Sequence, residues 1–189
     1  RQRQMCIRDS TYTPTAAEVA AGQIWIKLTS TGNGVCQAVP DSMLVTFTPS
    51  PTVNAGPDQT RCSNNAATTL NGSFTVATGV IWSGGNGGFS PSTTNVNAVY
   101  TPTAAEIANG SVTLTLSITG NGNCLGVSDQ VTLFFTPGPS ANAGADLFVC
   151  ANNAAFAMGG AVAVATGGTW TGGAGSYVPN NTTLNAVYT

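Results

Sequence analysis

Four cysteines recur at a fixed spacing and are the side chains best suited to covalent chemistry. Cys36 and Cys124 lie 88 residues apart, and so do Cys62 and Cys150. The chain has no histidine and no pair of cysteines separated by two residues, which argues against a zinc site. The natural interpretation is a disulfide, and a disulfide indicates an oxidising, extracellular compartment.

One repeat of this spacing contains Cys62 and Cys124, and we expect these two residues to form the disulfide. Closing the loop between them would stabilise the fold by roughly 4 kcal/mol in the chain-entropy model. The alternative is two free, buried thiols. In a standard β-sandwich the turn with Cys62 and the hairpin with Cys124 lie at opposite ends. The bond therefore requires a bend early in the first strand, near residues 56–57.

The acidic residues do not form a pattern typical of an enzyme. Residues 51–137 contain only Asp58, Glu106 and Asp129. Glu106 has the spacing of a helix cap with Thr103, and the two aspartates are expected to stabilise turns. Without histidine, catalytic triads are excluded, and so few carboxylates disfavour glycoside hydrolysis and calcium binding. We therefore predict a protein that is not an enzyme, with no catalytic, cofactor-binding or metal-binding residues.

Two glycine-rich segments, 84–88 and 172–175, have a composition that could suit phosphate binding. A phosphate-binding loop must be followed by a helix and by Lys-Ser or Lys-Thr, and neither segment is. We predict that both are turns.

The composition excludes two classes of partner. A net charge of −2 with five basic residues cannot form the positive surface that nucleic-acid binding needs. No apolar run approaches the roughly 18–20 residues of a membrane span. Only 6% of residues are charged, but 42% are hydrophobic and alternate with polar residues, which indicates folded strands rather than disorder.

The repeat sets the domain organisation. Tyr12, Tyr100 and Tyr188 lie 88 residues apart, and a period of this length is a whole domain. Prolines at 49–51 and 137–139 mark the domain edges. We expect the C-terminal half of a repeat in 11–49, a complete repeat in 51–137 and the N-terminal half of a third in 140–189. The chain is then a window on a longer array. Residues 1–10 do not fit the repeat and are interpreted as a foreign or artefactual tail.

Alternation of apolar and polar residues predicts about seven strands in 51–137. The clearest are 111–119 and 130–136, and residues 102–110 are expected to form a short helical turn. This pattern predicts an all-β fold of tandem immunoglobulin-like, antiparallel β-sandwich repeats. Eight side chains are predicted to be buried: Trp82, Tyr100, Leu114, Leu116, Ile118, Val131, Leu133 and Phe135. Three are predicted to face solvent: Thr113, Thr115 and Thr132.

Three segments carry a resemblance to a known family: 54–60 (Asn-Ala-Gly-Pro-Asp-Gln-Thr), 82–85 (Trp-Ser-Gly-Gly) and 100–103 (Tyr-Thr-Pro-Thr). The chain resembles the tandem PKD-like, immunoglobulin-fold repeats of long Bacteroidota-type bacterial surface adhesins. The resemblance covers residues 11–189 and implies secretion to the cell surface. The loop at 75–79 lacks the aspartates usual in the wider family, so no calcium role is carried over. The segment 41–43, with Ser42, resembles the O-glycan acceptor of such secreted proteins.

The predicted function is structural. We expect either an adhesin stalk, which holds a distal domain for a surface glycan or host ligand, or a self-assembling extracellular filament. The partners are then neighbouring repeats or other copies of the chain. The alternative is a carbohydrate-binding module of a secreted enzyme, which predicts a row of exposed aromatic residues. Trp25 and Phe134 face outward by alternation, but Thr113 stands where Trp25 would recur. The exposure of Trp25, Phe134 and Tyr177 distinguishes the two classes.

Overall fold

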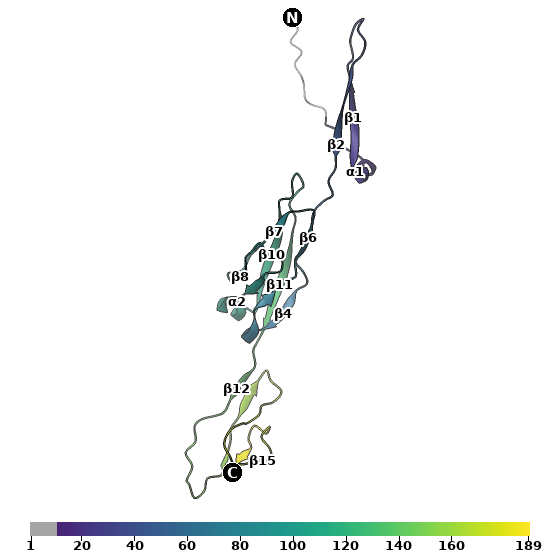
Figure 1. The fold of residues 1–189 in the computed structure, drawn as a ribbon. Coiled ribbons are helices and arrows are strands. Elements are labelled where there is room, and N and C mark those ends of the chain that lie inside the picture. The colour runs from purple at the N-terminus through teal and green to yellow at the C-terminus, as the bar shows by residue number, and fades with distance from the viewer. Residues whose placement is uncertain (1–10) are drawn as a thin grey trace.

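The computed structural model describes residues 11–189, which form an elongated series of three β-rich parts (Figure 1). The tail predicted at residues 1–10 lies outside the described residues. A hairpin with a short helix comes first, a two-layered β-sandwich lies in the middle, and a smaller set of strands follows (Figure 1). We call residues 51–137 the central repeat.

One sheet of the central repeat contains its longest strands. Its order is β4 (Gln59–Cys62), β11 (Ser128–Thr136), β10 (Ser111–Thr119) and β7 (Gly79–Ser83). The β10–β11 and β10–β7 pairs are antiparallel, as expected. The β4–β11 pair is parallel, which the expectation of an antiparallel sandwich missed. The first segment of the repeat begins in the other sheet at β3 (Thr52–Asn54) and then joins this sheet as β4, beside the last strand, β11.

The second sheet is built from shorter strands. β3 (Thr52–Asn54) pairs with β6 (Ser73–Thr75), and β9 (Val99–Thr101) lies between β5 (Thr68–Thr69) and β8 (Gly88–Ser90). A 3-10 turn, η1 (Ser63–Asn65), connects β4 to this sheet. Backbone bonds from Leu70 N–H to Ala98 O (2.9 Å) and from Gly72 N–H to Val96 O (3.3 Å) continue the sheet between β5 and β6. The two sheets together define an all-β, immunoglobulin-like sandwich.

The core lies between these sheets, and the predicted register is confirmed. All eight side chains predicted to be buried are at most 8% exposed. The three threonines predicted to face solvent lie on the opposite faces of β10 and β11. The buried core cluster and the apolar residues packed against it all come from the central repeat. This repeat therefore closes its own hydrophobic core.

A short helix, α2 (Ala104–Asn109), precedes β10 and has the predicted ends. Thr103 and Glu106 form a reciprocal capping box, and Gly110 ends the helix with φ 82°. Such a cap satisfies backbone N–H groups that the first turn leaves unpaired. The predicted helical turn is confirmed.

The N-terminal part repeats this local structure. α1 (Ala16–Ala21) has the same capping box, with Thr15 and Glu18, and is followed by β1 (Gln23–Thr29) and β2 (Pro40–Thr46). Gln23 pairs with Thr46, and the residues 88 positions later, Ser111 and Phe134, also pair. No residue of 11–49 is buried. The hairpin therefore has the structure of β10–β11 without the sheet that covers it.

The C-terminal part repeats the second sheet. β12 (Ser140–Asn142) pairs with β14 (Ala161–Ala163), and β16 (Val187–Tyr188) pairs with β13 (Phe156–Ala157) and β15 (Tyr177–Val178). Segments 147–150 and 167–171, the equivalents of β4 and β7, form no strand. In the central repeat β4 and β7 pair only with β11 and β10. Because 140–189 contains no equivalent of β10 and β11, these segments lack a pairing partner.

Candidate assembly interface

The hairpin of the N-terminal part has one open apolar face. Five side chains with Tyr12 and Pro14 line a groove on it: Ile24, Ile26, Met43, Val45 and Phe47. Their equivalents in the central repeat pack in or against the core: Val112, Leu114, Val131, Leu133 and Phe135. The groove is therefore a core-forming surface without its second layer.

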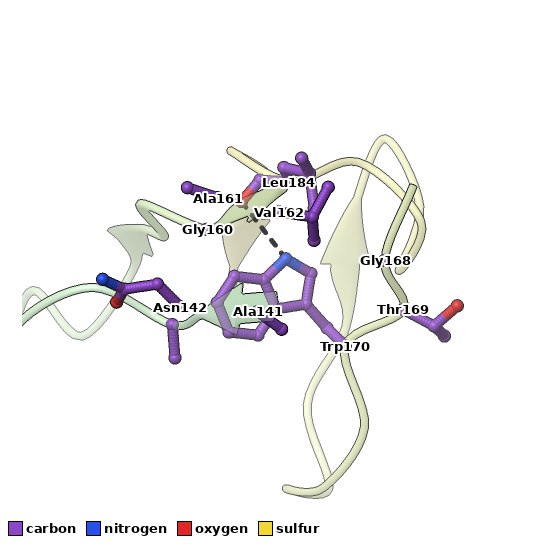
Figure 2. A pocket seen from close by; sticks show the side chains of 10 residues that line it. Ala141, Asn142, Gly160, Ala161, Val162, Gly168, Thr169, Trp170 and Leu184 are labelled. Carbon is purple, nitrogen blue, oxygen red and sulfur yellow. Dashed lines mark hydrogen bonds between the residues drawn. The ribbon is translucent and has the colours of Figure 1, made fainter. Parts of the chain in front are cut away.

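The C-terminal part has an open pocket, which Figure 2 shows from close by. Trp170 lies in a pocket with Leu184, Val162 and Gly160. Its equivalent in the central repeat, Trp82, is only 1% exposed. The pocket is open because no strand equivalent to β10 covers this part.

Trp170 and Trp82 make the same hydrogen bond but have different neighbours. Trp82 Nε1 donates to Val96 O at 3.2 Å, and Trp170 Nε1 donates to the equivalent Leu184 O at the same distance. Beside Gly72, however, the nearest side chain is Leu116 of β10, and beside the equivalent Gly160 it is the Trp170 ring. The Trp170 indole thus covers Gly160, whereas in the central repeat Leu116 covers the equivalent glycine, Gly72. Most residues that line the pocket are equivalents of residues in or against the core of the central repeat.

A buried polar network ties the glycine-rich loop to helix α2. Glu106, which is 6% exposed, accepts from the Tyr100 hydroxyl and from Asn86 N–H, both at 2.7 Å. Its other oxygen accepts from Thr103 N–H (2.7 Å) and Thr103 Oγ1 (2.9 Å). Gly87 N–H donates to the Tyr100 hydroxyl at 2.9 Å. The backbone N–H groups of this loop therefore bind the protein's own carboxylate and phenol.

Close packing explains why glycines occur here. A Cβ on Gly85, which has φ 66°, would lie 2.1 Å from the Tyr100 hydroxyl oxygen. The same clash recurs at Gly173 with Tyr188. The turn prediction for these segments is correct, but the sequence reasoning missed their partners, Tyr100 and Tyr188. A signal in the sequence could have identified Tyr100 and Glu106 as a pair. They recur as Tyr12 and Glu18, six residues apart in both copies.

The network shifts the pKa values of both its titratable groups, Tyr100 and Glu106. Burial, and then the hydrogen bond to Glu106, raises the pKa of Tyr100 to about 12. Burial opposes ionisation of Glu106, but hydrogen bonds from Thr103, Asn86 and Tyr100 together hold the pKa of its carboxyl below the usual value. The Glu106 contribution to stability is present above the ordinary carboxyl pKa and is lost as the pH falls through the lowered value. The Tyr100 contribution is present below about pH 10 and is lost as the pH rises through about 12.

We expect Glu106→Gln to lower the free energy of unfolding of the central repeat by about 2 kcal/mol at pH 7. An amide NH2 would face the two donors of Thr103, and charged hydrogen bonds would be lost. Urea denaturation at pH 7 and pH 3 measures the effect, which should be smaller at pH 3. Glu18→Gln is the matched control, because Glu18 makes the same bonds to Tyr12 and Thr15 in the exposed hairpin. Equal effects of the two variants on the central repeat would contradict this assignment.

The two aspartates also bond to backbone groups, but not in the turns expected for them. Asp58 Oδ1 accepts from Thr132 N–H on β11 (2.7 Å), and Asp129 Oδ2 accepts from Ala55 N–H (2.8 Å). Both bonds join the first segment of the repeat to its last strand. Residues 11–189 contain no group of three or more His, Cys, Asp or Glu side chains placed to hold a metal ion.

The predicted Cys62–Cys124 disulfide is absent from the structure, in which both residues are free thiols. Cys62 lies opposite Thr136 at the end of β11, whereas Cys124 lies in the loop before β11 begins. A nine-residue strand spans roughly 25 Å, and a disulfide needs Cα atoms within about 7 Å. The bend at Gly56 does not bring the two ends together. Cys36 and Cys150 are also free, and both are exposed.

The outward aromatic residues do not form a row. Trp25 is 68% exposed and Phe134 is 45% exposed, but they belong to different parts of the chain. Tyr177 is half-buried and packs its ring against Tyr188 at 5.1 Å. These three residues therefore do not provide the aromatic platform that a carbohydrate-binding module requires.

Comparisons with known proteins do not assign the chain to a family. No family model matches it, and no curated protein matches it. Among solved structures, the protocadherin gammaB7 EC3-6 cis-dimer is similar with 12% identity and a TM-score of 0.32. The match covers 70% of this chain and 37% of that chain. This likeness is too distant to inform function, and the fold class rests on the strand order itself. No helix within 11–189 has the length and apolar character of a membrane span.

Proposed function

We propose that the chain is a structural repeat region of an extracellular bacterial surface protein and acts as an adhesin stalk. The observation that supports this most directly is the end-to-end placement of the parts. The chain enters the central repeat at one end and leaves it at the other (Figure 1). Each added repeat then adds length, as in other quasi-one-dimensional repeat proteins.

The central repeat has the properties that a spacer needs. Its core is complete without help from the neighbouring parts. Each of its three carboxylates accepts hydrogen bonds from backbone groups, which suits a structural role and not a catalytic one. Under this proposal the stalk lies on the cell surface, and a distal domain binds the glycan or host ligand.

The equivalence of the two outer parts to segments of the central repeat supports a repeat array. We propose that 11–49 is the C-terminal half of one repeat and that 140–189 is the N-terminal half of another. Their open apolar faces are the two surfaces that meet in the central core. Completion by adjoining segments would close each of them.

Force spectroscopy on an array of copies of residues 50–137 tests the stalk proposal. Under reducing conditions each repeat should unfold as one event and release roughly 300 Å of chain, the extended length of 88 residues. Equal steps, one for each repeat, are expected. A single event for the whole array would contradict a chain of independent spacers.

A filament is the second candidate, supported by the complementary open faces of the outer parts. Where no further chain covers these faces, 11–49 of one molecule could complete 140–189 of another by strand addition. Sedimentation of the chain should then show assembly that Ile26→Asp abolishes. Trp25→Asp, on the outward face of the same strand, should leave assembly unchanged. Equal sedimentation of both variants and the unchanged chain would contradict the filament.

A further inference from the structure

The two cysteines of the central repeat each contact a proline segment at a domain edge. Cys62 Sγ lies 3.8 Å from Pro137 O, at the C-terminal end of the repeat. Cys124 Sγ lies 3.8 Å from Pro49 O, at the N-terminal end. Pro49 and Pro137 are equivalent residues, 88 positions apart. The two cysteines therefore contact equivalent prolines at the two ends of the repeat. Cys62 contacts the proline that follows the repeat's last strand, and Cys124 contacts the proline that precedes its first strand.

The threonine before each of these prolines also contacts the segment that contains the cysteine or the cysteine itself. Thr136 lies opposite Cys62 in the β4–β11 pair, and Thr136 Oγ1 donates to Arg61 O at 3.3 Å. Its equivalent, Thr48, places Oγ1 3.4 Å from Cys124 Sγ. The Thr-Pro pair at each joint is thus bordered by a Cys62-type residue of one repeat and a Cys124-type residue of the next.

In an array with this joint, the two sulfur atoms would both lie beside one proline carbonyl oxygen. Since each is 3.8 Å from that atom, they can be no farther apart than twice this distance. Cys62 and Cys124 of a single repeat, by contrast, are separated by the length of β11. Rotations of the two side chains could bring these sulfur atoms to bonding distance, whereas no side-chain rotation spans the length of β11.

We propose that consecutive repeats are joined by a disulfide from Cys62 of one repeat to the equivalent of Cys124 in the next. This proposal rests on the proposed repeat array. The two thiols each lose a proton and together give two electrons to an oxidant disulfide. That disulfide is reduced to two thiols by thiol–disulfide exchange, and one new S–S bond forms. The product is a covalent strap beside each proline joint, which restrains bending and keeps the joint closed under tension.

An array of three copies of residues 50–137 tests the strap, because the central repeat closes its own core. The array is refolded in a mixture of reduced and oxidised glutathione, denatured without reduction and labelled with a maleimide. Bonds between consecutive repeats use four of the six cysteines and leave two to be labelled, Cys124 of the first copy and Cys62 of the last. Bonds within each repeat leave none. Six labelled cysteines mean that no bond forms. Either no labelled cysteine or six labelled cysteines would overturn the proposal.

Two matched variants locate the bonds. Cys62→Ser in the first copy should break the first strap and give three labelled cysteines. Cys124→Ser in the same copy should keep both straps and give one labelled cysteine. Equal labelling of the two variants would overturn the proposal. The length of the array separates this result from the stalk proposal. An extended array without straps refutes only the disulfide, whereas a compact array refutes the stalk.

Discussion

Replacing Trp82 with alanine is expected to destabilise the central repeat by about 3–5 kcal/mol. The indole is 1% exposed in the middle of the core, on a strand that pairs directly with β10. Its loss removes a large apolar side chain and leaves a cavity between the sheets. Because small domains are stable by only about 5–15 kcal/mol, the variant should be largely unfolded in moderate urea.

Trp170→Ala is the matched control for this prediction. Trp170 makes the same hydrogen bond as Trp82 but lines an open pocket in the C-terminal part (Figure 2). Its replacement should leave the unfolding midpoint of the central repeat unchanged. Circular dichroism during urea denaturation measures both variants. A Trp82 variant as stable as the original chain would contradict the burial that defines the sandwich.

The second large effect concerns the C-terminal part. Residues 140–189 alone should not form a stable fold, because the strands equivalent to β10 and β11 are missing from them. In the central repeat these strands contribute seven apolar side chains to the core: Val112, Leu114, Leu116, Ile118, Val131, Leu133 and Phe135. At about 1.5–3 kcal/mol for each large apolar side chain, their loss removes on the order of 10–20 kcal/mol.

Completion of the fragment should restore the fold. Extending 140–189 directly with residues 102–137 adds the missing helix and both strands in the register of the repeat. The amide NMR spectrum should be poorly dispersed for 140–189 and well dispersed for the extended chain. A dispersed spectrum from monomeric 140–189 would mean that this part is a domain in its own right.

The sequence predicts the features of this fold that depend on local patterns. The alternation in 111–119 and 130–136 assigns each side chain to the core or to solvent, because neighbouring residues of a strand face opposite sides. The capping box of Thr103 and Glu106 is equally local. The 88-residue period shows which distant segments are equivalent, and it therefore predicts that the hairpin recurs in the N-terminal part.

Features that depend on contacts between distant segments could not be predicted in this way. The parallel pairing of β4 with β11 depends on a change of sheet near Gly56, and it is what places Cys62 opposite Thr136. Counting cysteines in each repeat therefore could not show that Cys62 and Cys124 lie toward opposite ends of β11. The bonds from Asp58 to Thr132 and from Asp129 to Ala55 likewise join segments far apart in the sequence.

The length of arrays in solution tests the stalk most directly. Small-angle X-ray scattering on two, four and six copies of residues 50–137 gives the maximum dimension and the radius of the cross-section. If the repeats lie end to end, each repeat adds the same length while the cross-section stays constant. A compact arrangement would instead give a radius of gyration that grows only as roughly the 0.38 power of the number of residues. Growth of that kind would contradict a stalk of repeats placed end to end.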